Sequence, residues 1–452
     1  MDFLEDLQTS QGSDQLVLDD GSQVAVIGGG PAGSFFSFYI LDMAKRIGID
    51  IDVDIYEPRD FTRPAPRGCN MCGGIVSESL VQTLAADGIN LPPSVVQRGI
   101  DSYMLHMDVG SVRIKTPLQE KRIGAVTRGP GPRDVKEIKW ESFDGHLQNL
   151  AKEKGAEIIN ERVSGVELDD GRPQLKTRRG SQKTYDLVAV AVGVNSPTAK
   201  LFEDLDFGYQ MPDTTKTFIC EYYFGEDKIK EIFGSSAHFF LLNIPRLKFA
   251  AIIPKGDYVT VCMLGDDIDD ELVQGFLNSS EVKSCMPEEW GAEGRSCWCL
   301  PRMNVKGAVQ PYTDRIVFIG DCGVSRLYKD GIGAAYRTAK AAASTAVFQG
   351  ISAEAFKQHF EPACRTITTD NLIGKLSFMV TDQIKKRRFA LKAMLQMTVD
   401  EQKNEGKKPH MSTVLWDMFT GSAPYRDIVM RTFHPGFLIN FASRMVATLW
   451  RR

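Results

Sequence analysis

The fold is decided by the stretch QVAVIGGGPAGSFF, residues 23–36. Its apolar start, residues 23–27, predicts a short buried strand, and residues 34–46 predict a helix. The pattern G-x-G-x-x-G at the turn between them is formed by Gly28, Gly30 and Gly33. In this pattern the first glycine permits a tight turn, the second lets a pyrophosphate approach the backbone, and the third lets helix and strand pack closely. The helix N-terminus then offers unpaired N–H groups and a positive dipole end to phosphates.

A carboxylate follows at the spacing that ribose binding requires. A second strand, with the alternating sequence IDIDVDIYE over residues 49–57, ends at Glu57. Glu57 lies 24 residues beyond Gly33, which suits an acid that accepts hydrogen bonds from a ribose. Loop and acid together favour a dinucleotide-binding unit over a plain glycine-rich turn with a solvent-facing glutamate.

A second strand-to-helix unit occurs late in the chain. The segment DRIVFIGDCG, residues 314–323, predicts an apolar strand that runs into Gly320 and Asp321. After a short loop, DGIGAAYRTAKAAASTA, residues 330–346, predicts a helix of small residues that is preceded by Gly331 and Gly333. The Asp321 carboxylate can bind a ribityl hydroxyl, and the helix N-terminus can face a pyrophosphate or the O2 side of a flavin. The alternative at this point is an ordinary β-α unit with an aspartate cap.

The middle of the chain supplies further elements of the same domain. Residues 142–154 predict a helix, followed by a strand and a hairpin turn at DDGR, residues 169–172. The segment TYDLVAVAVGVNSPTAKLF then predicts a strand that ends at Gly193.

In this ordered set of motifs the chain resembles the FAD-dependent oxidoreductases of the geranylgeranyl reductase and FixC type, which share their flavin fold with the aromatic hydroxylases. The resemblance covers residues 22–350. It rests on GGGPAG, on the FD-x-x-L helix with its GAEI strand, on the V-A-x-G-x-x-S strand end, and on IGD…DGIGAAYRTAK. It implies FAD rather than NAD as the cofactor, and a flavin domain assembled from separate chain segments and interrupted by a substrate domain.

The resemblance also assigns a role to the loop RGCNMCGGIVSESL, residues 67–80. Geranylgeranyl reductases carry a Cys-Gly-Gly loop on the catalytic face of the flavin, and Cys72, Gly73 and Gly74 match it. Cys72 is therefore the candidate proton donor to a substrate carbon. Cys69 and Cys72 also form C-x-x-C, so a redox dithiol, half a zinc site with Cys297 and Cys299, and a pair of buried thiols all remain open. We expect no metal.

Three features depart from the family pattern. Ala251 stands where the family tends to have a tryptophan before a proline, here Pro254. The loop after Gly-Asp has Arg326 and Lys329 in place of a proline. The helix at residues 142–154 is preceded by Trp140 rather than by an arginine, so Arg128 or Arg133 is the candidate for the charge that faces the FAD phosphates. These departures bear on the substrate more than on the flavin.

The predicted architecture is an α/β fold with a Rossmann-like FAD-binding domain of the glutathione reductase and hydroxylase type, an inserted mixed β-sheet domain and a C-terminal helical region. The FAD-binding domain takes residues 20–85, 126–204 and 306–350. The substrate domain takes residues 86–125 and 205–305, and its many apolar strand residues suggest an apolar cavity. Residues 351–452 are predicted to be helical, with one helix over 384–397 and a last helix that ends the chain.

Charge is distributed unevenly. The net charge of −4 predicts no nucleic-acid partner, but residues 371–452 hold 14 basic against 6 acidic residues and so carry +8. We therefore expect contact of this basic region with an anionic membrane surface, or docking of the last helix on the protein itself. The acidic N-terminus does not resemble a signal peptide, no apolar run is long enough to span a bilayer, and nine scattered cysteines suit reduced thiols in a cytoplasm.

The leading hypothesis is a reductase that transfers hydride from reduced FAD to a carbon–carbon double bond of a lipid-like or isoprenoid substrate. A flavin monooxygenase or halogenase, or an electron-transfer flavoprotein that feeds membrane quinone, are the alternatives. The electron donor is NAD(P)H, ferredoxin or another redox protein. The candidate cofactor-binding residues are Gly28, Gly30, Pro31, Ala32, Gly33, Glu57, Arg59, Gly73, Gly74, Arg128, Gly320, Asp321, Gly331, Ile332 and Gly333, with Cys72 as the catalytic candidate.

Overall fold

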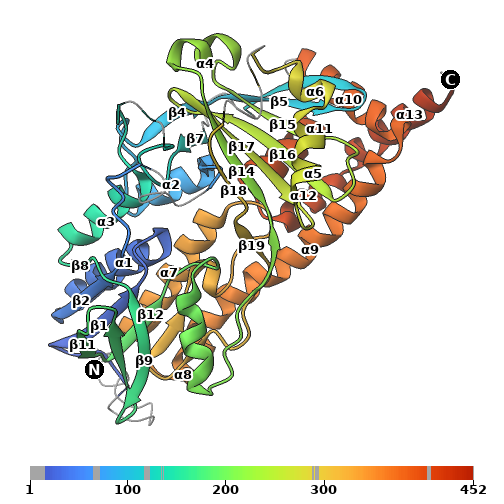
Figure 1. Cartoon of the computed structure of the whole chain (residues 1–452). Coiled ribbons are helices and arrows are strands. Elements are labelled where there is room, and N and C mark those ends of the chain that lie inside the picture. The colour runs from blue at the N-terminus through green and yellow to red at the C-terminus, as the bar shows by residue number, and fades with distance from the viewer. Residues whose placement is uncertain are drawn as a thin grey trace.

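Two large β-sheets and a set of C-terminal helices make up the molecule (Figure 1). The computed structural model describes residues 16–64, 72–116, 123–133, 135, 137–287, 290, 295–404 and 409–450. The first sheet lies at the lower left of the view and the second at the upper right, and the C-terminal helices, orange to red, line the right-hand side.

The first sheet has six strands in the order β20-β21-β12-β1-β2-β8. Their bounds are β1 Ser22–Ile27, β2 Ile51–Tyr56, β8 Glu157–Ile159, β12 Leu187–Val190, β20 Tyr312–Thr313 and β21 Ile316–Phe318. All neighbours are parallel except β20 and β21. The central strand is β1, whose last residue, Ile27, pairs with Tyr56 on one side and Val190 on the other. The glycine loop therefore leaves the sheet at its middle, where open α/β sheets bind ligands.

Alternation along β1 separates the two faces of this sheet. Val24 and Val26 pack with helices α1 (Pro31–Ile47) and α7 (Gly331–Phe348), whereas Ala25 and Ile27 pack on the other side. That other side is covered by the antiparallel ribbon of β9 (Val163–Asp169), β10 (Arg172–Thr177) and β11 (Gln182–Thr184). The DDGR segment forms the hairpin turn between β9 and β10, with positive φ at Asp170 and Gly171.

The second sheet has seven strands in the order β18-β14-β17-β16-β15-β5-β6. Their bounds are β5 Ser102–Met107, β6 Gly110–Lys115, β14 Phe218–Tyr223, β15 Ser236–Leu241, β16 Leu247–Pro254, β17 Tyr258–Gly265 and β18 Arg295–Cys299. Only β15 and β5 pair in parallel, so the sheet is mixed, as predicted. Along β16, Ala250 and Ile252 face a core shared with α5 (Asp270–Leu277), while Ala251 and Ile253 face the opposite way.

Smaller elements connect the two sheets. They are β3 (Ile75–Val76), α2 (Glu78–Ala86), β4 (Val96–Ile100), β7 (Ile123–Val126), α3 (Phe143–Glu153), a 3-10 helix (Pro197–Leu205), β13 (Asp213–Lys216), α4 (Glu226–Ile232), α6 (Ser280–Lys283) and β19 (Arg302–Lys306). Strands β3, β7 and β4 form one small sheet, and β13 pairs with β19. The segment that carries the Cys-Gly-Gly motif enters β3 directly, so that motif lies between the two large sheets.

The C-terminal region is helical, as predicted, but it is not a separate unit. Its helices are α8 (Ala353–Ala355), a π-helical turn (Phe356–Phe360), α9 (Glu361–Lys385), α10 (Arg388–Lys403), α11 (His410–Thr420), α12 (Tyr425–Thr432) and α13 (Pro435–Trp450). Trp416, Phe419 and Tyr425 share one apolar core with the inner face of the seven-stranded sheet. Helices α11 and α12 therefore pack directly on the sheet that was predicted as the substrate domain.

The single helix predicted over residues 384–397 is wrong. Helix α9 ends at Lys385 and α10 begins at Arg388. The buried Lys385 amine donates to the carbonyls of Leu247 and Lys248, which anchors the chain on β16, and Arg387 then takes an extended conformation. Among the described residues, none of the helices combines the length and apolarity needed to cross a bilayer.

Candidate active site

The glycine loop leads from β1 into α1 and leaves no room for side chains. Helix α1 starts at Pro31. Its N-cap residue is Gly30, which has no side chain to cap the first turn. A Cβ atom at Gly33 would lie 1.9 Å from the Gly28 carbonyl oxygen, and one at Gly28 would lie 2.5 Å from the Ala191 carbonyl oxygen. Gly28 itself has a φ of +107°, which disfavours other residues. The first turn of α1 is therefore held against the strand ends with its N–H groups unpaired by side chains.

Glu57 is fixed beside this loop. It follows β2, and its Oε2 accepts a hydrogen bond from the Gly29 N–H at 3.0 Å while its Oε1 accepts one from the Arg59 N–H at 2.8 Å. The side chain is buried, and burial raises the pKa of Glu57, against the backbone hydrogen bonds that lower it. A buried carboxylate held at the end of the second strand is placed to accept a hydroxyl donor in the neighbouring cavity.

The late Gly-Asp segment meets the glycine loop from the other side. Gly320 has a φ of +64°, and a Cβ there would lie 2.7 Å from the Cβ of Ala32 at the start of α1. The next residue, Asp321, lines the same cavity as Gly30 and Pro31. The two motifs are thus joined at the edge of the sheet, although about 290 residues separate them in the sequence.

Helix α7 also begins at the cavity without a side-chain cap. Its N-cap residue, Asp330, instead forms ion pairs with Arg326 at 2.8 Å and Arg337 at 2.6 Å. A Cβ at Gly333 would lie 2.2 Å from the Asp330 Oδ1, so glycine is required for this arrangement. Two uncapped helix N-termini, those of α1 and α7, therefore line one cavity, which favours an anionic ligand.

Arg326 and Lys329, in the loop after Gly320 and Asp321, contact the C-terminal helices. Arg326 also forms an ion pair with Asp370 at 3.2 Å. The Lys329 amine donates to the carbonyls of Asp417 and Ala423 and lies 4.0 Å from the centre of the Tyr425 ring. Burial lowers the pKa of Lys329 well below its usual value. These side chains tie the loop before α7 to α9, α11 and α12.

The Cys-Gly-Gly loop forms one wall of the cavity. The Cys72 Sγ accepts a hydrogen bond from the Gly74 N–H at 3.4 Å, and Cys72 is half-buried. Gly74 has a φ of +71°, and a Cβ there would lie 1.9 Å from the Val126 carbonyl oxygen and 2.8 Å from the Lys255 amine. Cys69, the other half of the C-x-x-C pattern, lies outside the described residues.

A second thiol stands beside this loop. A Cβ at Gly73 would lie 3.1 Å from the Sγ of Cys262, a residue of β17 that also lines the cavity. Burial raises the pKa of Cys262 to about 12, so this thiol stays protonated at neutral pH. Sequence reasoning missed Cys262 because a lone cysteine in an apolar strand is an ordinary core residue.

A buried ion pair fixes Arg128 at the cavity. Its Nε and Nη2 donate to the two carboxylate oxygens of Asp144, each at 2.9 Å. Asp144 is fully buried in the first turn of α3, where the Ser142 hydroxyl caps the helix and donates to the Arg128 carbonyl. Burial lowers the pKa of Arg128, but the Asp144 carboxylate more than compensates and raises it above its usual value. Arg133, the alternative candidate, is exposed and does not line the cavity.

Most of these groups line one cavity of about 610 Å³. Its lining includes the predicted residues that we call its polar end: Gly28, Gly30, Pro31, Ala32, Glu57, Arg59, Cys72, Gly73, Gly74, Arg128, Asp321, Gly331 and Ile332. Gly33, Gly320 and Gly333 do not line it; Gly33 allows close contact with the backbone of Gly28, and Gly320 and Gly333 allow close contact with the side chains of Ala32 and Asp330. Apolar side chains also line it, and we call this set its apolar end: Ile219, Phe239, Phe249, Ala251, Ile253, Leu264 and Phe419. Phe419, from α11, could not be found from the sequence because it is distant from every motif.

Neither protein-family models nor curated proteins match this chain. Among solved structures, it is similar to a geranylgeranyl bacteriochlorophyll reductase-like protein from Thermoplasma acidophilum, with a TM-score of 0.61, 14% identity and coverage of 92% of this chain and 99% of that chain. It is also similar to a flavoprotein/dehydrogenase from Cytophaga hutchinsonii, with a TM-score of 0.63, 13% identity and coverage of 96% and 100%. A third similar structure is p-nitrophenol 4-monooxygenase from Pseudomonas putida, with a TM-score of 0.56, 14% identity and coverage of 90% and 100%.

These similarities extend over nearly the whole length of each partner at low sequence identity. They therefore establish the fold and leave the reaction open. The chain has the α/β fold of the flavin-dependent oxidoreductases, a group that includes reductase-like proteins and monooxygenases.

Proposed function

We propose that this protein is an FAD-dependent reductase of carbon–carbon double bonds in an apolar, lipid-like or isoprenoid substrate. The observation that carries the proposal is the continuity of the cavity. One cavity is lined by two uncapped helix N-termini, by a buried carboxylate, by Cys72, Gly73 and Gly74, and by a set of apolar side chains.

The polar end fits a flavin dinucleotide. The backbone N–H groups at the starts of α1 and α7 would bind phosphate oxygens, and Glu57 would accept hydrogen bonds from the adenosine ribose. Asp321 would accept one from the ribityl chain. Arg128 would face the phosphates with a charge that Asp144 holds in a fixed orientation.

Reduction of a double bond needs one hydride and one proton. A reduced flavin supplies the hydride and is oxidised in doing so. Cys72 would deliver the proton to the second carbon, because it is half-buried and lines the cavity between the polar and apolar ends. The Gly74 N–H donates to its sulfur and would stabilise the thiolate that remains, which then regains a proton from water.

The apolar end suits a hydrocarbon substrate. Strands β14 to β17 contribute mainly aliphatic and aromatic side chains to it, and such a wall binds by excluding water. Ala251 occupies little space where related proteins tend to have a tryptophan, which leaves room for a bulkier chain. The electron donor would be NAD(P)H, ferredoxin or another redox protein.

The proposal is tested by anaerobic incubation of the FAD-loaded, dithionite-reduced protein with geranylgeranyl lipids. Mass spectrometry should show products that have gained two hydrogen atoms per reduced bond. Cys72→Ala should retain FAD and lose turnover, whereas Cys262→Ala serves as the matched control and should keep most of it. Loss of FAD in Cys72→Ala, or unchanged turnover, would remove Cys72 from the reaction. No gain of hydrogen by any isoprenoid would refute the reductase.

A second candidate is a monooxygenase, which the likeness to p-nitrophenol 4-monooxygenase supports at the level of the fold. In that case the same cavity would hold an aromatic or apolar substrate and O2 would be the oxidant. Incorporation of oxygen from labelled O2 into a product would favour this reading. Reduction of membrane quinone without a stable hydrogenated product would instead favour an electron-transfer flavoprotein.

A further inference from the structure

Exposed apolar side chains concentrate in the C-terminal helices. Among the described residues, 18 large hydrophobic side chains are exposed, and 11 of them lie between Leu372 and Trp450. Because scattered exposed apolar residues are normal but gathered ones mark interaction surfaces, this concentration needs an explanation.

Helix α9 has apolar residues on two opposite sides. Leu372, Leu376, Met379 and Val380 are each more than half exposed, and their spacing of four, seven and eight residues places them on one face. The opposite side packs on the protein, where Gly374 and Phe378 contact Tyr425 of α12. The exposed face is therefore not the face by which α9 joins the core.

Helix α13 is arranged in the same way. Phe437 is buried, and the Thr448 hydroxyl donates to the Phe389 carbonyl of α10, so this side docks on the protein. The other side exposes Leu438, Ile439, Val446, Leu449 and Trp450, the last of them 85% exposed. One side of this helix thus docks on the protein, while its other side stays exposed, so docking does not exclude the membrane contact that the sequence offered as the alternative.

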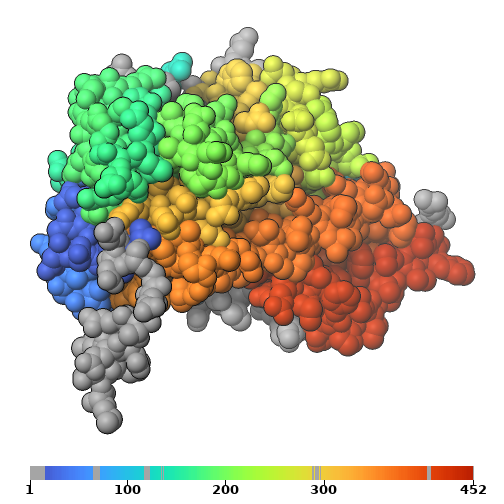
Figure 2. Space-filling model, turned by 90° about the horizontal axis from the view of Figure 1, so that it is seen from below, coloured from blue at the N-terminus to red at the C-terminus, as the bar shows by residue number. Residues whose placement is uncertain are grey.

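The exposed faces belong to neighbouring helices. Helix α12, which exposes Met430 and Phe433 at its C-terminal end, packs against α9 and also contacts α13. Figure 2 shows these segments, orange and red, gathered at one end of the molecule. We call the exposed apolar side chains of α9, α12 and α13 the C-terminal apolar surface.

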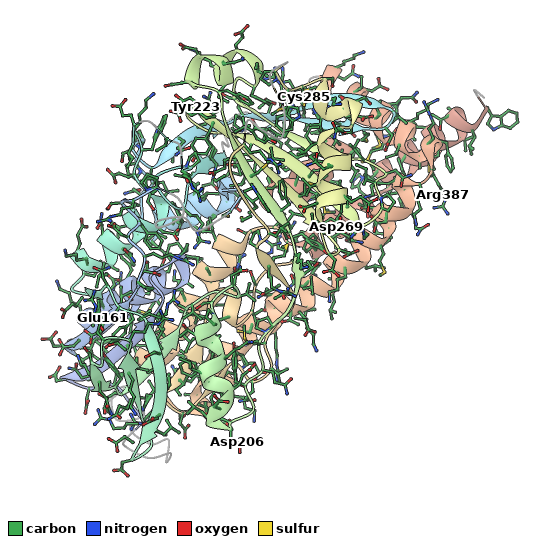
Figure 3. All side chains as sticks on the ribbon, viewed as in Figure 1. Glu161, Asp206, Tyr223, Asp269, Cys285 and Arg387 are labelled. Carbon is green, nitrogen blue, oxygen red and sulfur yellow. The ribbon has the colours of Figure 1, made fainter. Side chains whose placement is uncertain are left out.

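Positive charge accompanies this surface. Lys375 is exposed on α9, and Lys386, Arg387 and Arg388 are exposed where α9 gives way to α10. Arg387 is labelled at the right-hand edge of Figure 3, among these helices. Residues 371–452 carry +8 in a chain whose total is −4, so the charge is specific to this region.

We propose that the C-terminal apolar surface binds the surface of an anionic phospholipid bilayer. Apolar side chains would enter the headgroup region while the lysines and arginines contact lipid phosphates, as in other interfacial helices. A second copy of this chain fits less well, because two surfaces of the same positive charge would face each other. The inference concerns the partner of the protein and does not depend on the reaction proposed above.

The test is co-sedimentation of the FAD-loaded protein with vesicles of phosphatidylglycerol and phosphatidylcholine, and with vesicles of phosphatidylcholine alone. We expect binding to the anionic vesicles that weakens at high salt. The triple variant Leu372→Ser, Leu376→Ser, Met379→Ser should lower the partition coefficient at least about tenfold. A matched variant with exposed apolar residues elsewhere, Ile47→Ser, Leu168→Ser, Val309→Ser, should bind like the wild type.

Retention of FAD by both triple variants would show that each is folded. Equal loss of binding in both variants, or no binding of the wild-type protein to either vesicle, would overturn the proposal. A change from dimer to monomer in the first variant, with no vesicle binding by the wild type, would identify the surface as an interface between two copies. Because vesicle binding is measured without turnover, its failure is distinguishable from failure of the proposed reaction.

Discussion

Substitutions of Arg128 and of Asp144, which form an ion pair, can distinguish a role in cofactor binding from a role in folding. Both distances are 2.9 Å, the Asp144 side chain is completely buried, and the Arg128 side chain is 19% exposed toward the cavity. Replacing Asp144 with Asn leaves a buried guanidinium without its counter-charge. Breaking a buried pair in this way costs about 3–5 kcal/mol. Asp144→Asn should therefore lower the free energy of unfolding of the apoprotein by about that amount.

FAD affinity should fall more in a variant of Arg128 than in Asp144→Asn. Arg128→Gln removes a charge-assisted hydrogen bond to the phosphates, worth about 1.5–3 kcal/mol, or roughly 10–150-fold in the dissociation constant. Asp144→Asn keeps the guanidinium, and a bound phosphate would replace the lost carboxylate. Its FAD affinity should stay within a few-fold of the wild type, so FAD should stabilise both proteins against urea by a similar amount.

The assay is titration of the apoprotein with FAD, followed by flavin fluorescence, together with urea unfolding with and without FAD. The reasoning would be refuted if Asp144→Asn weakened FAD binding as much as Arg128→Gln did. Arg128 would then serve only to hold α3 in place. Equal FAD affinities for Arg128→Gln and the wild type would exclude contact of this side chain with the phosphates.

Two further predictions concern stability. A Cβ at Gly33 would lie 1.9 Å from a backbone oxygen, so Gly33→Ala should lower the free energy of unfolding, measured in urea, by at least about 3 kcal/mol. The control Gly48→Ala places a Cβ that meets no atom within 4 Å, but at a φ of +79°, and should lower it by only about 1 kcal/mol. Equal losses in the two variants would contradict the packing argument. His106 and His238 hydrogen bond to each other at 3.1 Å, and burial lowers their pKa values to about 4 and about 3. Because each histidine binds a proton below about pH 6.5 in the unfolded chain, but only below about pH 4 (His106) or about pH 3 (His238) in the folded chain, stability should fall as the pH drops from 6.5 to 3, by roughly 2 kcal/mol per histidine at pH 5. His106→Asn with His238→Asn should reduce this pH dependence in unfolding experiments, and an unchanged slope would be evidence against it.

Local sequence patterns predicted several local structures correctly. The glycine loop, Glu57 and the hairpin turn at residues 169–172 depend on residues a few positions apart, and steric limits at glycine make such turns readable. The α/β fold class and the mixed second sheet were predicted correctly. The Cys-Gly-Gly wall came from the resemblance, because nothing in three residues shows which cavity they face.

Features that depend on distant contacts could not be predicted. Cys262 and Phe419 join the cavity only because β17 and α11 pack near the loop at Cys72. The break at residues 386–387 depends on hydrogen bonds of Lys385 to strand β16, which helical periodicity does not reveal. The exposed face of α9 was also missed, because an apolar stripe with helical spacing normally faces the core.

Stopped-flow reoxidation of the reduced, FAD-loaded protein distinguishes a double-bond reductase from a monooxygenase. The photoreduced protein would be mixed anaerobically with isoprenoid lipids in one experiment and with O2 in another. We expect fast return of the oxidised flavin absorbance with the lipids, slow return with O2, and loss of the fast phase in Cys72→Ala. Fast reoxidation by O2 with no response to lipid would contradict the account and make the protein a monooxygenase.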